Sequence, residues 1–125
     1  MRALRIDRLT GPPAPLRDCA GRVVAARCYR AASAGARLVG LLGTPDLAPD
    51  EALWLEPCGS VHTVGLRAPI GCAFLDARGS VLRVVDPMPR WRVAGGRGAR
   101  AVVECRAGAL AGLGPGDRLA RGADG

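Results

Sequence analysis

The 125-residue chain contains no lysine, a single histidine and only four aromatic residues. All eighteen basic residues are therefore arginines, and the one histidine is His62. With so few aromatic side chains, a hydrophobic core must be built mainly from valine, leucine, alanine and cysteine. The length suits one ordinary domain rather than two, and such a domain buries enough surface to fold without disulfides or metal ions.

Long apolar runs are also missing. The first ten residues, MRALRIDRLT, carry charges at positions 2, 5, 7 and 8, which leaves no continuous apolar stretch for a signal peptide. No segment of about 18 apolar residues exists, so the sequence predicts no membrane span. We therefore expect a cytoplasmic protein.

The cysteines do not follow the spacing of a disulfide framework or a zinc knuckle. There are five of them, an odd number, and no two form a Cys-x-x-Cys pair: Cys19, Cys28, Cys58, Cys72 and Cys105. Free cysteine usually behaves as a small buried hydrophobe. We expect no cofactor and no metal ion.

The net charge of +7 raises the question of nucleic-acid binding. Eight arginines lie within residues 1–37 and seven within 87–125, while the middle of the chain, 38–86, is net acidic. The arginines form neither a dense run nor a helical stripe, which a surface that follows phosphates would require. The pattern favours a solvated basic surface over a nucleic-acid interface.

Short segments rich in β-forming residues alternate with turn signals along the chain. They predict strands at 22–31, 51–56, 61–66, 70–76, 80–86, 100–106 and 118–120. In the first strand, Val23, Ala25, Arg27 and Tyr29 are expected to share one face. The 70–76 segment is apolar on both faces, which predicts a central strand. DARG (76–79) and GPGD (114–117) have the residue preferences of type I and type II turns.

One segment has helical rather than strand periodicity. Within 33–43, the apolar residues Ala34, Leu38, Leu41 and Leu42 form one helical stripe, and Gly43 suits the helix end. The sequence thus predicts a mostly-β domain, a sandwich or a barrel-like fold, with one short helix after the first strand. We assign residues 1–21 to an N-terminal extension, 22–120 to this single domain and 121–125 to a tail.

The order of motifs along the chain resembles a known family. RLVGLLG (37–43), PCGSVHTVGLRAPIGCAFLD (57–76), GSVLRVV (79–85), VVECRAG (102–108) and GPGD (114–117) are similar to the bacterial and archaeal domain of unknown function 192 family. The resemblance covers about residues 22–120. It implies a mostly-β jelly roll or distorted barrel with a short helix, and it implies no established activity. It also suggests a link to pilus or secretion systems.

The family pattern falls on ten positions of this chain: Arg37, Gly40, Leu41, His62, Thr63, Pro69, Glu104, Gly108, Gly116 and Asp117. One position departs from it, because the Pro-Ile pair is usually followed by aspartate and here by Gly71. If that aspartate serves chemistry in relatives, this chain has lost it or replaced it. A catalytic interpretation is weakened accordingly.

Cys58 and His62 are the candidate catalytic pair, since a neighbouring imidazole can activate a thiol. Along an extended strand, four residues span about 13 Å, which is too far for proton transfer. A turn at Pro57 and Gly59 could bring the two side chains together. The alternative is that Cys58 is a packing residue. Cys72 and Cys105 could complete a zinc site with these two residues, but the four positions lack the closely spaced ligand pairs of a structural zinc site.

Arg67, His62 and Thr63 could converge on a carboxylate or phosphate, because arginine suits planar, bidentate recognition. Alternatively, Arg67 pairs with Glu104 or Asp76 and joins two strands.

Glu104 interrupts an apolar strand and shares its face with Val102 and Arg106. It is either a partner of an arginine, with Arg37 the natural choice, or a pocket residue with a shifted pKa. Between these two, the salt bridge is favoured.

Together these observations predict an uncharacterised, non-catalytic accessory or small-ligand-binding β domain. Its expected partner is a small anionic ligand or another protein, and its expected ligand-binding residues are His62, Thr63, Arg67 and Glu104, with Cys58 beside them. The alternative is a hydrolase or transferase that uses Cys58 with His62.

Overall fold

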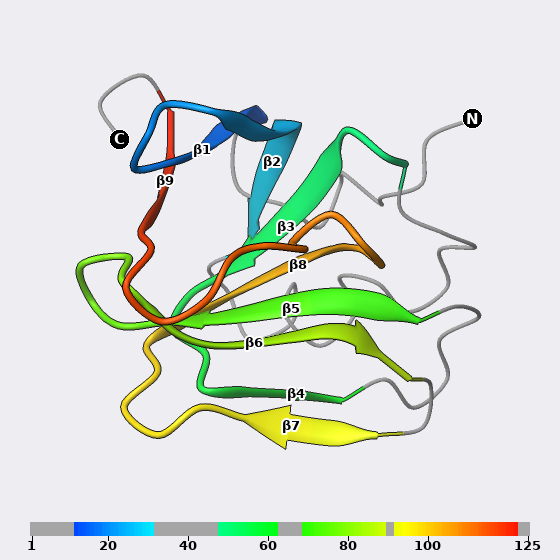
Figure 1. Ribbon diagram of the computed structural model, residues 1–125, viewed down its shortest axis with the longest axis vertical. Helices are drawn as coiled ribbons and strands as arrows, with labels where there is room; N and C mark the ends of the chain where they lie inside the picture. The colour runs from blue at the N-terminus through cyan, green and yellow to red at the C-terminus, as the bar shows by residue number, and fades with distance from the viewer. Residues whose placement is uncertain (1–11, 32–47, 63–68, 90–91, 123–125) are drawn as a thin grey trace.

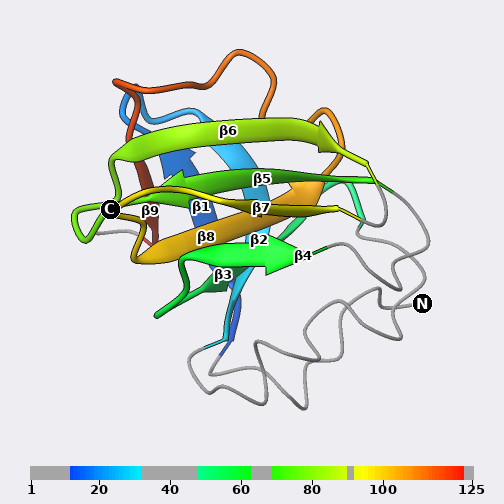
Figure 2. The ribbon, with the colours of Figure 1, turned by 90° about the horizontal axis from the view of Figure 1, so that it is seen from below.

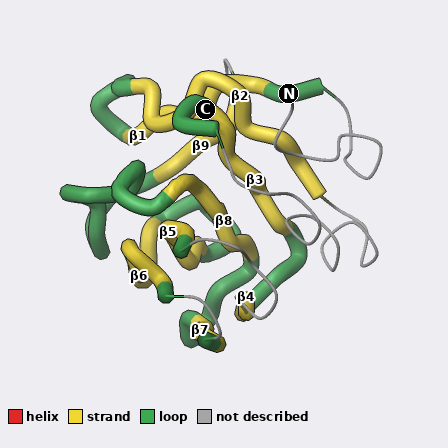
Figure 3. The backbone as a smooth tube through the Cα atoms, turned by 90° about the vertical axis from the view of Figure 1, so that its right-hand side faces the viewer, coloured by secondary structure: helices red, strands yellow, loops and turns green. Residues whose placement is uncertain are grey.

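The computed structural model describes residues 12–31, 48–62, 69–89 and 92–122 (Figure 1). These residues form nine β-strands, and the described part of the chain contains no helix (Figure 3). The mostly-β prediction is therefore confirmed. The short helix expected at 33–43 lies outside the described residues. Within the same ranges, no helix has the length and hydrophobicity needed to cross a membrane.

Seven strands form one sheet and two form a separate ribbon. The sheet has the order β6-β5-β8-β3-β2-β1-β9, and the ribbon pairs β4 with β7. All pairs are antiparallel except β2 with β3. The strands are β1 (Ala14–Asp18), β2 (Val23–Ala31), β3 (Glu51–Leu55), β4 (Ser60–His62), β5 (Ile70–Leu75), β6 (Val81–Met88), β7 (Val93–Gly95), β8 (Ala101–Arg106) and β9 (Leu119–Arg121).

The large sheet is open, but its two edge strands meet at one end. An isolated bridge pairs Ser80, just before β6, with Arg118, just before β9. The Val81 amide donates to the carbonyl of Asp117 at 2.9 Å, and the Leu119 amide donates to the carbonyl of Gly79 at 2.9 Å. The sheet is consequently strongly curved rather than flat.

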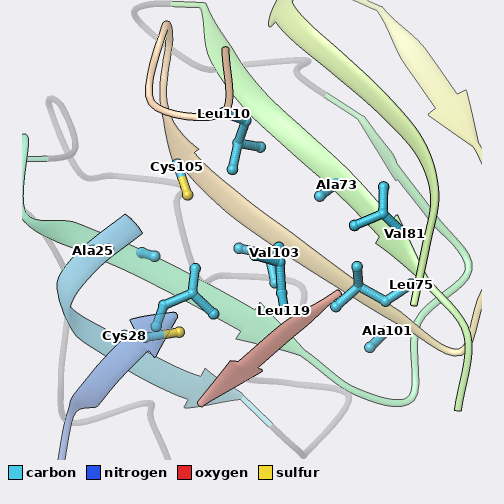
Figure 4. Close-up of a cluster of buried hydrophobic side chains, with 12 residues drawn as sticks. Ala25, Cys28, Ala73, Leu75, Val81, Ala101, Val103, Cys105, Leu110 and Leu119 are labelled. Carbon is cyan, nitrogen blue, oxygen red and sulfur yellow. The ribbon is translucent and has the colours of Figure 1, made fainter. Parts of the chain in front are cut away.

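The curvature gives the sheet an inner face with its own hydrophobic core. Side chains from β2, β5, β8 and β9 point toward one another there, together with Leu110 from the loop after β8 (Figure 4). Leu75, Val103 and Leu119 are all at most 1% exposed. Small residues such as Ala73 and Cys105 let the facing strands approach within the curve.

The outer face carries the second core, and the β4–β7 ribbon covers part of it (Figure 2). Val61 of β4 and Ala94 of β7, which pair with each other, both pack against it. Its fully buried members come from five strands of the sheet: Tyr29, Leu53, Leu55, Ile70, Cys72, Phe74, Met88 and Val102.

Strand β5 supports the strongest of the strand predictions. All six of its residues are buried, and it lies between β6 and β8. Alternate side chains feed the two cores, with Cys72 and Phe74 on the outer face and Ala73 and Leu75 on the inner one. An apolar run without alternation is what such a doubly covered strand requires.

The expectation that Ala25 and Tyr29 share a face of β2 was wrong. Ala25 belongs to the inner core and Tyr29 to the outer one. The pairing of β1 with β2 explains the difference, because Leu16 faces Ala25 whereas Ala14 faces Cys28. The extra residue on β2 is a β-bulge, and it shifts the alternation of side chains by one position.

Both predicted turns agree with the hydrogen bonds of the structure. At DARG, the Gly79 amide donates to the Asp76 carbonyl, and the Asp76 carboxylate accepts the amides of Arg78 and Ser80. At GPGD, the Asp117 amide donates to the Gly114 carbonyl, and Gly116 has the positive φ that a type II turn needs.

Strand β1 lies within the segment that the sequence sets apart as an N-terminal extension. It pairs with β2 on one side and with β9 on the other, and Leu16 is completely buried in the inner core. The chain before residue 22 thus contributes directly to the sheet.

Candidate functional site

A single row of side chains crosses the outer face of the sheet through five neighbouring strands. The registers place its members side by side: Tyr29, Leu53, Glu104, Cys72 and Val85. Facing residues on adjacent strands have Cβ atoms about 5 Å apart, so each member contacts the next. One carboxyl group therefore lies among apolar side chains in the middle of the row.

Glu104 occupies this central position on β8, between Leu53 of β3 and Cys72 of β5. Its side chain is 6% exposed, and no hydrogen bond or ion pair joins its carboxyl group to another residue of the described ranges. Burial raises the pKa of the Glu104 carboxyl to about 8 from its ordinary value of 4.5. At neutral pH this group is mostly protonated, and it can donate a hydrogen bond as well as accept one.

Glu51, the other buried glutamate among the described residues, has a different environment. Its Oε1 accepts the amide of Ala48 at 3.0 Å, and its Oε2 lies 3.5 Å from Nη2 of Arg27. Arg27 also holds both carboxylate oxygens of Asp50. Oε2 of Glu51 is buried without a hydrogen-bond partner and has only this ion pair with Arg27. For Glu104, no described residue provides even an ion pair.

Cys72, next to Glu104, is a buried packing residue. Its Sγ lies 3.7 Å from Sδ of Met88. Burial raises the pKa of the Cys72 thiol far above its ordinary value, and the adjacent Glu104 raises it further. The thiolate needed for nucleophilic or metal chemistry is therefore disfavoured at this position.

Cys58, the candidate nucleophile, lies in the turn before β4 and packs against the outer core. Its Sγ donates to the carbonyl oxygen of Ser60 at 3.1 Å, and its backbone amide donates to the carbonyl of Arg100 at 2.9 Å. The backbone of His62 pairs with Val93. The side chain of His62 lies outside the described part of the structure, so the contact between thiol and imidazole stays a prediction.

The remaining residues predicted for the site also lie outside the described ranges. Thr63 and Arg67 belong to the connection between β4 and β5, and Arg37 belongs to the segment between β2 and β3. The convergence of His62, Thr63 and Arg67 on an anion, and the salt bridge of Glu104 with Arg37, therefore stay predictions. Glu104 is the one predicted ligand-binding residue whose side-chain environment is described.

Asp86 is a residue that the sequence did not single out. Its Oδ1 accepts the amide of Gly108 at 2.7 Å, and its Oδ2 accepts the amide of Leu110 at 2.9 Å. A Cβ atom placed on Gly71 would lie 2.8 Å from this carboxyl group. The space beside residue 71, where the family usually has an aspartate, is thus occupied by a carboxylate from the neighbouring strand.

Only the register of β5 against β6 brings residue 86 to residue 71, because fifteen positions separate the two in the sequence. The sequence carries one faint signal of this exchange. Residue 71 lacks the aspartate that is usual in the family, and the predicted 80–86 strand ends on another aspartate. Elsewhere among the described residues, no group of three or more histidine, cysteine, aspartate or glutamate side chains is placed to hold a metal ion.

We call the row of Tyr29, Leu53, Glu104, Cys72 and Val85 the Glu104 row. Together with the fold, it defines a small β domain with a curved sheet and an acidic side chain buried in one face. More specifically, the chain belongs to the DUF192 family, described as an uncharacterized ACR, which it matches over residues 18–121. The resemblance inferred from the sequence is therefore confirmed. Among curated proteins, the chain has no match.

Two solved structures share the fold. One is a "putative transcription regulator" from Sinorhizobium meliloti, with a TM-score of 0.77 and 20% identity, covering 90% of this chain and 95% of that one. The other is a protein of unknown function from Novosphingobium aromaticivorans, with a TM-score of 0.71 and 18% identity, covering 93% of this chain and 96% of that one. At these identities the similarity shows the fold alone.

Proposed function

We propose that the chain is a non-catalytic module that binds a small anionic ligand at the outer face of its sheet. The observation that carries this proposal is Glu104, a carboxyl group that is 6% exposed and has no partner among the described residues. A buried polar group without a partner costs free energy, and a ligand that pairs with it recovers that cost. A protonated Glu104 would donate a hydrogen bond to a ligand carboxylate.

The positive charge of the site is assigned to Arg67 and His62, with Thr63 as an additional donor. Arginine binds carboxylates in a bidentate manner, and a ligand pocket needs only a few polar groups on an apolar wall. The apolar wall is the core around Leu53 and Cys72. For the scaffold we propose a distorted barrel, which the meeting of β6 and β9 at Ser80 and Arg118 supports.

The alternative, a hydrolase or transferase built on Cys58 and His62, has less support. The hydrogen bond from Sγ of Cys58 to the carbonyl of Ser60 uses the protonated thiol, and a nucleophile needs the thiolate. We therefore prefer a binding module, and we place it in the cytoplasm as an accessory component, with pilus or secretion systems as the suggested setting.

A role in transcription is named for the Sinorhizobium meliloti protein. For this chain, nucleic-acid binding would need a continuous basic surface, and the arginines are dispersed between the two ends of the sequence. Nonspecific phosphate contacts also weaken steeply with salt. Loss of any DNA binding at physiological salt would agree with the small-ligand proposal.

The direct test is an NMR titration with succinate as a simple carboxylate probe. We expect saturable shifts of the amides of Leu53, Cys72 and Glu104 in the wild type. Glu104→Gln, which cannot be ionised, should alter the pH dependence of binding. Glu104→Ala should abolish binding. Cys58→Ser is the control, since a binding module retains its ligand without the thiol.

Two results would refute the proposal. One is the absence of saturable shifts on this face. The other is rapid alkylation of Cys58 by iodoacetamide at pH 6, which would reveal a stabilised thiolate and favour the enzyme.

A further inference from the structure

Two adjoining pockets open along β9, and neither is lined by a residue of the Glu104 row. The first has a volume of about 240 Å³ and lies between the ends of β2 and β3, the β5–β6 turn and β9. The second has a volume of about 300 Å³ and lies between the β1–β2 turn and β9. Ala120 lines both. In Figure 1, β9 begins near the β5–β6 turn and runs from there alongside β1.

Arginine is the dominant charged residue in the pocket pair. Arg30, Arg78 and Arg121 line the first pocket, and Arg17 and Arg118 line the second. Five arginines thus face three carboxylates, which belong to Glu56, Asp76 and Asp18.

The three carboxylates are already engaged with donors of the protein. Asp76 accepts the amides of Ser80 and Arg78, and these backbone hydrogen bonds lower the pKa of its carboxyl group. The nearby charges of Arg78 and Arg118 lower this pKa further. Asp18 accepts the amides of Ala20 and Arg22.

The third carboxylate, that of Glu56, accepts the indole N–H of Trp54 at 2.9 Å and lies 3.8 Å from Nη2 of Arg30. Trp54 is half-buried and forms part of the wall of the first pocket.

Two of the arginines, by contrast, keep donors available. Arg78 is exposed, and its guanidinium donates to no residue of the described ranges. Arg118 uses Nε to donate to the carbonyl of Arg78 at 2.9 Å, and neither of its terminal nitrogens has a described acceptor. The two side chains therefore present guanidinium N–H groups from neighbouring segments.

The backbone holds these two segments together. The Leu119 amide donates to the carbonyl of Gly79, and a Cβ atom on Gly79 would lie 2.5 Å from the carbonyl oxygen of Leu119. Gly79 also has a φ of +84°, which favours glycine. Because only glycine permits this approach, the backbones at Arg78 and Arg118 are held beside each other before any ligand binds.

We propose that the pocket pair binds the phosphate group of a small molecule, held between Arg78 and Arg118. Guanidinium groups bind phosphate through paired, charge-assisted hydrogen bonds, which suits two arginines on neighbouring segments. Arg30 and Arg17 add positive charge at the two flanks. Trp54 supplies apolar surface for the organic part of a phosphate ester.

The test is an NMR titration of the full chain with inorganic phosphate and, separately, with AMP. We expect saturable shifts of the amides of residues 76–79 and 118–121, with those of Cys72 and Glu104 unchanged. Arg78→Ala should weaken binding about tenfold, the loss expected for one charge-assisted pair. Arg97→Ala removes an exposed arginine that lines neither pocket, and should leave binding unchanged.

The two probes distinguish the source of the phosphate. Tighter binding of AMP, with a shift of the Trp54 indole resonance, would mean that the ligand is a phosphate ester. Equal affinities for AMP and phosphate would mean that the ligand is free phosphate. The proposal is overturned if no saturable shifts occur at these segments, or if Arg97→Ala weakens binding as much as Arg78→Ala. Glu104→Gln should have no effect, which separates this site from the proposed ligand face.

Discussion

At the residue scale, Glu104 links burial to the pH dependence of stability. Its pKa is about 8 in the folded chain, and an unfolded chain restores the ordinary value of 4.5. Between these pH values the folded state holds a proton that the unfolded state has released. Stability therefore falls as the pH rises through this window, and the effect is absent below it.

Glu104→Gln removes this titration while keeping the shape of the side chain. Between pH 5 and pH 8, we expect the free energy of unfolding of the wild type to fall relative to the variant by roughly 3–4 kcal/mol. Urea denaturation of both proteins at the two pH values measures the difference. Parallel pH profiles for the two proteins would show that Glu104 does not titrate abnormally.

Asp86 and Gly71 provide a second prediction at the scale of single residues. Asp86→Ala should cost roughly 2–4 kcal/mol, because the amides of Gly108 and Leu110 lose a charged acceptor. Gly71→Asp alone should also destabilise, since its side chain meets the Asp86 carboxylate. The double variant Gly71→Asp/Asp86→Ala should recover much of the loss.

A double-mutant cycle by chemical denaturation measures this coupling. If the double variant loses the sum of the two single stability losses, an aspartate at position 71 cannot replace the carboxylate of Asp86. Recovery would identify the usual family aspartate as a structural residue that holds the loop after β8.

At the scale of elements, local chemistry predicted much of the fold. Strand β5 follows from an apolar run without alternation, and the turns at Asp76 and Gly116 follow from their residue preferences. The β4–β7 ribbon and the role of β1 were not predicted, because both depend on pairing between distant segments. The bulge in β2 was missed for the same reason, since it appears only in the register against β1.

The approach of the β5–β6 turn to β9 can be tested with two glycine variants. Gly79→Ala combines a positive φ with a contact of 2.5 Å to the Leu119 carbonyl, whereas Gly116→Ala has a φ of +102° and open space around it. Gly116→Ala should cost about 1 kcal/mol for backbone strain. Gly79→Ala should cost clearly more.

Denaturation midpoints give the two costs, and hydrogen exchange gives the location. In Gly79→Ala, the amides of Val81 and Leu119 should exchange faster, because their hydrogen bonds join the edges of the sheet. Equal stability of the two variants would mean that this contact does not hold the edges together.

For the whole molecule, the cysteines report on the integrity of both cores. Cys28, Cys72 and Cys105 are completely buried, and burial raises the pKa of each thiol. Cys19 is exposed. We expect the native protein to react quickly at Cys19, while the three buried thiols react only after unfolding.

Labelling with a thiol reagent, followed by mass spectrometry of the peptides, tests this prediction at neutral pH. Fast labelling of Cys28, Cys72 or Cys105 in the native state would contradict the arrangement of the two cores. The result would also show how firmly the β4–β7 ribbon covers the outer core, because Cys72 lies in that core.

The candidate site could be predicted only in part from the sequence. Glu104 was singled out because a carboxylate interrupts an apolar strand, and the structure places it in the centre of the outer face. Its neighbours Leu53 and Tyr29 were not predicted, since the order of strands in the sheet is not readable from local patterns. The arginine-lined pockets combine residues that are more than a hundred positions apart in the chain, such as Arg17 and Arg118.

The measurement that tests the central claim most directly is the pKa of Glu104. An NMR titration of the side-chain carboxyl carbon measures this pKa, and the Glu104→Gln variant identifies the signal of that carbon. The account predicts a pKa of about 8, the mark of a buried carboxyl group available to a ligand. A value at or below the ordinary 4.5 would mean that Glu104 is ionised and paired within the chain, and it would contradict the proposed ligand face.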